Sequence, residues 1–91
     1  MAKVEIYTKN WCGYSALAKE HLDRKGLSYE EIDVTTDAVR ETEMVNRSGR
    51  HTVPQIFIDG YHVGGSDDLI AAEKSGLLDR LLAGRVEGEA A

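Results

Sequence analysis

The first half of the chain alternates short apolar runs with amphipathic stretches. Residues 4–7 and 28–34 have the apolar, β-branched and aromatic content that is typical of strands. Residues 13 to about 25 and 37 to about 48 carry apolar positions at helical spacing, and Thr36 is the expected cap of the second helix. Because a helix separates the two strands, we expect them to pair in parallel through a right-handed crossover.

Each predicted helix has a modest apolar side and a glycine beyond its end. In the first helix this side is formed by Ala16, Leu17, Ala18, His21 and Leu22. In the second it is formed by Val39, Met44 and Val45. Gly26 and Gly49 are the expected stop positions, because glycine readily adopts the left-handed backbone that closes a helix.

The second half predicts a hairpin instead of a crossover. Residues 55–58 form a run of high β-propensity, and Asp59-Gly60 is a strong signal for a two-residue turn. Residues 61–63 are expected to return antiparallel to the first strand of this hairpin. Gly64-Gly65 then breaks the strand, and Ser66 is the expected cap of the helix that follows.

A last helical region ends the predicted fold. Gly76 interrupts it, and a leucine stripe follows at Leu77, Leu78, Leu81 and Leu82. We expect one domain over residues 1–84 and a flexible tail over residues 85–91. The element order βαβαββα predicts an α/β fold with a four-stranded mixed sheet and helices on both sides.

Composition and charge narrow the function classes. The chain has 91 residues, one cysteine and a net charge of −5, which disfavours nucleic-acid and anionic-membrane partners. It has no apolar run long enough to span a bilayer and no apolar signal region after its first residues. A single cysteine forms no intrachain disulfide, so we expect a reducing, cytoplasmic compartment. We also expect a monomer.

The one cysteine, Cys12, falls where the first strand and a short loop give way to the first helix. Unpaired backbone N–H groups and the positive end of the helix dipole favour an anion there. Both effects favour the thiolate, which is the reactive form of cysteine. The sequence therefore predicts thiol-exchange chemistry centred on Cys12.

Three motifs resemble those of the glutaredoxins, within the thioredoxin superfamily, and the resemblance covers residues 3 to about 83. Cys12-Gly13-Tyr14-Ser15 is similar to the active-site tetrad, which in many members is Cys-Pro-Tyr-Cys. Thr52-Val53-Pro54 is similar to the loop that contains a cis proline, and Gly64-Gly65-Ser66-Asp67-Asp68 is similar to the helix start that holds glutathione. The resemblance implies a thioredoxin fold and glutathione as the cofactor.

The resemblance also implies roles for individual residues. Cys12 is the nucleophile, and Ser15 stands at the position of the resolving cysteine. The implied glutathione-binding residues are Lys9, Tyr14, Thr52, Val53, Pro54, Gly65, Ser66 and Asp67. The Ser-Asp-Asp segment also fits a plain helix cap, and the two roles are compatible because they use the same N–H groups.

The cation for the glycine carboxylate of glutathione is less clear from sequence. Lys9 is the candidate. Arg40, Arg47 and Arg50 also lie nearby in sequence, but the sequence does not give their positions relative to the site. A contact that some relatives make from the second helix falls at Glu41, which would repel a carboxylate, so it is not carried over. The three histidines have no metal-ligand spacing, and no metal site is predicted.

Ser15 is the main departure from the pattern, because serine cannot form a disulfide. It leaves a monothiol route, the reduction of protein–glutathione mixed disulfides by Cys12. Two origins stay open, a natural monothiol site and a Cys→Ser replacement, and Ser66 also stands where some relatives have cysteine. If position 15 is natively cysteine, the protein also reduces disulfide-bearing partners.

Two other functions are considered beside this one. Gly13 makes the tetrad similar to the Cys-Gly-Phe-Ser of the monothiol branch, which handles iron–sulfur clusters, although the short loop of residues 8–11 is similar to the dithiol branch. The alternative is therefore a homodimer in which Cys12 of each subunit and two glutathiones hold a [2Fe–2S] cluster. A redox-inactive binding domain on the same fold is the third hypothesis.

Overall fold

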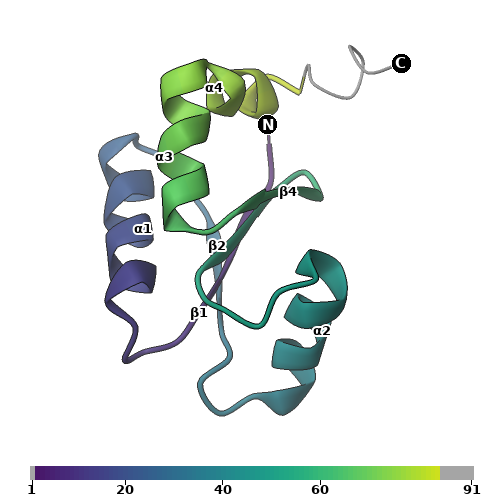
Figure 1. Ribbon diagram of the computed structural model, residues 1–91. Helices are drawn as coiled ribbons and strands as arrows, with labels where there is room; N and C mark the ends of the chain where they lie inside the picture. The colour runs from purple at the N-terminus through teal and green to yellow at the C-terminus, as the bar shows by residue number, and fades with distance from the viewer. Residues whose placement is uncertain (1, 85–91) are drawn as a thin grey trace.

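A computed structural model describes residues 2–84, which form a four-stranded mixed sheet with helices on both faces (Figure 1). The sheet order is β2-β1-β3-β4, with β1 and β2 parallel and the other pairs antiparallel. The strands are β1 (Val4–Thr8), β2 (Glu30–Asp33), β3 (Gln55–Ile58) and β4 (Tyr61–Gly64). The helices are α1 (Gly13–Arg24), α2 (Ala38–Ser48), α3 (Ser66–Ser75) and α4 (Leu77–Leu82). The predicted fold class is confirmed, while the predicted tail over residues 85–91 lies outside the described residues.

Alternating strand residues divide the core between the two faces of the sheet. Figure 1 shows α1, α3 and α4 over one face of the sheet and α2 over the other. Ile6 and Ile56 belong to the cluster on the first face, while Tyr7 and Phe57 belong to the cluster on the second. The larger cluster also contains Val4, Ala18, Leu22, Ile58, Leu69, Ala72, Leu78 and Leu81. The smaller one also contains Ile32, Val34 and Met44. Helices on both faces leave the ends of the strands as the place for a site.

The predicted hairpin is confirmed, and it contains an irregularity that the sequence did not indicate. Asp59 and Gly60 both have positive φ, 50° and 81°, as a tight two-residue turn requires. Ile56 pairs with Gly64 and Phe57 with His62, so Val63 is an extra residue in β4. This bulge re-aims the chain just before α3 begins.

Several local predictions are wrong. The second strand is shorter than residues 28–34, because only Glu30–Asp33 pair with β1. Asp37, not Thr36, caps α2, since the Asp37 carboxylate accepts a hydrogen bond from the Arg40 N–H at 3.0 Å. Val39 is 78% exposed, so the apolar side of α2 consists of Met44 and the half-buried Val45.

The apolar side of α1 is also narrower than predicted. Ala18 and Leu22 are buried, whereas Ala16 is exposed and Leu17 is 42% exposed. The glycine stops are confirmed, because Gly26 and Gly49 have φ of 71° and 72°. None of the helices in residues 2–84 is long and apolar enough to cross a bilayer.

Candidate active site beside Cys12

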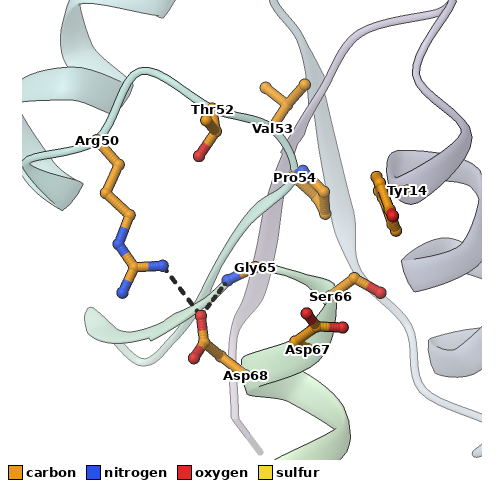
Figure 2. A pocket seen from close by; sticks show the side chains of 9 residues that line it. All are labelled: Tyr14, Arg50, Thr52, Val53, Pro54, Gly65, Ser66, Asp67 and Asp68. Carbon is orange, nitrogen blue, oxygen red and sulfur yellow. Dashed lines mark hydrogen bonds and ion pairs between the residues drawn. The ribbon is translucent and has the colours of Figure 1, made fainter.

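A groove of about 220 Å³ lies between the loop before β3 and the start of α3 (Figure 2). Tyr14 from α1 lies on one side of it and Arg50 on the other. The remaining lining residues are Thr52, Val53, Pro54, Gly65, Ser66, Asp67 and Asp68. Three segments far apart in the chain therefore build one site.

Cys12 lies at the edge of this groove and occupies the N-cap position of α1. Its thiol donates a weak hydrogen bond to the carbonyl oxygen of Val53, with a sulfur–oxygen distance of 3.6 Å. Cys12 is half-buried, and Tyr14 and Trp11 beside it are 65% and 70% exposed. The sulfur thus contacts the backbone of a residue that lines the groove.

The pKa of the Cys12 thiol is lower than that of an ordinary cysteine. Burial of the sulfur acts to raise this pKa, but the Ser15 N–H and hydroxyl, the Tyr14 N–H and the Lys9 ammonium together stabilise the thiolate more strongly. Ser15 is buried, and its oxygen also lies 3.5 Å from the Lys9 N–H. The serine at the resolving position therefore supports the thiolate instead of attacking a disulfide.

Replacing Ser15 with alanine should raise the pKa of the Cys12 thiol, because one of the donors to the thiolate is lost. The pH dependence of alkylation by iodoacetamide measures this pKa directly. We expect the midpoint of the wild-type curve to lie below that of a free thiol, and that of Ser15→Ala to lie higher than that of wild type. Coinciding midpoints would contradict the role given to the Ser15 hydroxyl.

The loop before β3 is held from beneath by a buried amide. Gln55 is fully buried, and its Nε2 donates to the Thr52 carbonyl oxygen at 3.0 Å and to Thr52 Oγ1 at 3.2 Å. The Gln55 Oε1 lies 2.7 Å from His62 Nε2 on β4. The Val53–Pro54 peptide is cis, as the resemblance implied. Two hydrogen bonds therefore fix the wall of the groove to Gln55 on β3, and a third fixes Gln55 to β4.

The opposite wall is the start of α3, and its cap differs from the predicted one. Gly65 is the N-cap, and Ser66 is already the first residue of the helix. Asp68 Oδ2 accepts a hydrogen bond from the Gly65 N–H at 2.9 Å (Figure 2). The same oxygen forms an ion pair with Arg50 Nη1 at 3.0 Å. The Ser66 hydroxyl is therefore not needed as a cap.

The structure brings most of the predicted binding residues together. Tyr14, Thr52, Val53, Pro54, Gly65, Ser66 and Asp67 all line the groove. Lys9 does not line it, because its ammonium pairs with Glu41 at 3.0 Å and lies 5.6 Å from the centre of the Trp11 ring. The assignment of Lys9 to glutathione stays a prediction.

The sequence predicted no position in the site for Arg50 and no separate role for Asp68. The only sequence signal for Arg50 was a cation four positions before Pro54. Nothing local in the sequence shows that this loop folds back against α3, so the pair of Arg50 and Asp68 became visible only in the structure.

Known proteins with similar sequences belong to one family. The Glutaredoxin family profile matches residues 4–63. The chain belongs to the glutaredoxin family. It is 54% identical over 82 residues to Glutaredoxin 3 of Escherichia coli strain K12, which covers 90% of this chain and 99% of that protein.

Solved structures give the same result. The solution structure of glutaredoxin from Brucella melitensis has a TM-score of 0.79 at 52% identity, covering 90% of this chain and 89% of that one. The crystal structure of the buckwheat glutaredoxin–glutathione complex has a TM-score of 0.82 at 26% identity, covering 92% and 79%. As a glutaredoxin, this chain has the thioredoxin fold and is a glutathione-dependent thiol–disulfide oxidoreductase.

Proposed function

We propose that this glutaredoxin reduces protein–glutathione mixed disulfides by a monothiol mechanism in which Cys12 is the nucleophile. The observation that carries the proposal is a half-buried cysteine whose thiol has a lowered pKa and contacts the backbone of Val53, which lines the groove. The chain has no second cysteine to resolve a disulfide, so the second thiol has to come from solution.

The reaction consists of two thiol–disulfide exchanges. The Cys12 thiolate attacks the glutathionyl sulfur, a Cys12–glutathione disulfide forms, and the target leaves as a thiolate that takes up a proton. A second glutathione, as its thiolate, then attacks the glutathionyl sulfur on Cys12. Glutathione disulfide leaves and the Cys12 thiolate is restored. The mixed disulfide is thus exchanged for glutathione disulfide, one free glutathione thiol is consumed and one protein thiol is released.

The groove decides which sulfur is attacked. The backbone of Val53 is available to pair with an extended peptide, as in strand addition. The N–H groups of Ser66 and Asp67 at the start of α3 suit a carboxylate, and the Asp67 side chain suits an ammonium. A glutathione held this way presents its sulfur to Cys12, because Cys12 contacts the carbonyl of the same Val53.

The protein partners in this proposal are glutathionylated proteins, and the buckwheat relative crystallised with glutathione supports the same ligand here. We propose a cytoplasmic monomer with no nucleic-acid or membrane partner, in keeping with the net charge of −5 and the single cysteine. The [2Fe–2S] alternative is not favoured. It requires Cys12 of two subunits, and no observation on the described residues supports such an assembly.

A comparison of two peptide substrates tests the proposal. One peptide carries glutathione on its cysteine, and the other has an internal disulfide between two cysteines. With glutathione, glutathione reductase and NADPH, the protein should deglutathionylate the first at least about 100-fold faster than it reduces the second, because position 15 offers no resolving thiol. Equal rates on both peptides, or no turnover of the first, would overturn it.

A further inference from the structure

Arg50 is the one lysine or arginine that lines the groove within residues 2–84. It comes from the loop after α2, and its guanidinium reaches across to Asp68 at the start of α3 (Figure 2). The Arg50 Nη1 lies 3.0 Å from Asp68 Oδ2, and the side chains are 48% and 45% exposed. The cation is thus part of the groove and is also open to solvent.

The position of this guanidinium is fixed from both ends. At the backbone end, the Arg50 N–H donates to Ser48 Oγ at 3.0 Å, and Ser48 Oγ donates to the Arg50 carbonyl oxygen at 3.1 Å. At the other end, the Gly65 N–H holds the same Asp68 oxygen that accepts from Arg50. Arg50 is therefore oriented before any ligand binds, which reduces the entropy lost on binding.

Much of the hydrogen-bonding capacity of Arg50 is unused. Of its five guanidinium N–H donors, only those on Nη1 have a partner among the described residues. A guanidinium with a free edge is suited to a carboxylate, because it offers parallel N–H donors in one plane. The free edge of Arg50 is thus available to a carboxylate in the groove.

We propose that Arg50 is a specificity-determining residue that binds the α-carboxylate of the γ-glutamyl group of glutathione. This inference rests on the proposed function, since it takes glutathione as the occupant of the groove. The γ-linkage leaves an α-carboxylate and an α-ammonium free at the glutamyl end of glutathione. The ion pair of Arg50 and Asp68, which joins the two walls of the groove, would thus recognise this linkage.

The charges of the groove favour this assignment. The γ-glutamyl end brings one carboxylate and one ammonium. Asp67 lines the groove and suits the ammonium, while the carboxylate needs a cation beside the N–H groups of α3. Arg50 supplies this cation at the α3 wall, whereas the ammonium of Lys9 is occupied by Glu41 away from the groove.

The test is a single-turnover titration that varies enzyme and ligand together. Wild type, Arg50→Gln and Arg40→Gln are mixed with a glutathionylated peptide, and transfer of the glutathionyl group to Cys12 is followed by mass spectrometry. Arg40 is the matched control, because it pairs with Glu43 on α2 and does not line the groove. The same titrations use peptides that carry 4-aminobutyryl-Cys-Gly, which lacks the α-carboxylate, and γ-Glu-Cys-ethylamide, which lacks the glycine carboxylate.

We expect Arg50→Gln to raise the half-saturating concentration of the glutathionylated peptide about 10-fold, with the maximal rate changed less than about 2-fold. Arg40→Gln should behave as wild type. On the 4-aminobutyryl substrate, wild type and Arg50→Gln should differ by less than about 2-fold, because the partner of Arg50 is gone. On the ethylamide substrate the difference of about 10-fold should persist.

Two results would overturn the inference. An equal penalty for Arg50→Gln on all three substrates would show that Arg50 only shapes the groove. A penalty that disappears on the ethylamide substrate would move the contact to the glycine carboxylate. Both results leave wild-type transfer to Cys12 intact, whereas failure of wild type to accept the glutathionyl group would refute the proposed function itself.

Discussion

Replacing Cys12 with serine will reduce the turnover of glutathionylated substrates at least about 1,000-fold, to the rate of exchange in solution. A serine hydroxyl is not ionised near neutral pH, and it cannot form the mixed disulfide on which both exchange steps depend. The measurement is the coupled assay with glutathione, glutathione reductase and NADPH. Mass spectrometry should find the glutathione adduct on wild type and none on Cys12→Ser.

The control for this prediction is Ser15→Ala, which removes a neighbouring hydroxyl and leaves the sulfur in place. It should retain turnover within about 10-fold of wild type, because it changes the pKa of the nucleophile and not its identity. The two variants should melt within a few degrees of wild type, since both changes are small. Substantial turnover by Cys12→Ser at an unchanged melting temperature would remove Cys12 from the mechanism.

Replacing Gly64 with alanine should lower the free energy of unfolding by about 2–4 kcal/mol. Gly64 has φ of 117°, a backbone conformation that a residue with a Cβ atom rarely adopts. The new Cβ would also collide with Asp68 Oδ2 and lie 2.8 Å from Asp68 Cβ, so the Asp68 side chain would have to move. Urea unfolding followed by circular dichroism measures the change.

The displaced Asp68 adds a second readout. Its carboxylate holds both the Gly65 N–H and Arg50, so Gly64→Ala should also weaken binding of the glutathionylated peptide. Gly13→Ala is the matched control, because a Cβ at Gly13 meets nothing within 4 Å and the residue lies in the first turn of α1. It should change the free energy of unfolding by less than about 1 kcal/mol. Equal effects of the two alanines would show that the close approach of Asp68 does not matter.

The amino-acid sequence by itself determined the order of elements and the position of the proposed nucleophile. Alternating runs such as residues 55–58 and the Asp59-Gly60 turn are local signals, because side-chain periodicity and turn geometry depend on neighbouring residues alone. The same holds for Cys12 at a helix start, where the exposed N–H groups follow from the helix itself. Motif spacing then predicted eight glutathione-binding residues, and seven of these eight line the groove.

The tertiary structure alone decided how the two walls of the groove are connected. Arg50 and Asp68 are 18 residues apart, and their ion pair joins the loop after α2 to the start of α3. The same long-range packing turned Lys9 toward Glu41 and left Val39 on the surface. Such contacts depend on the relative positions of separate elements, which no local sequence pattern specifies.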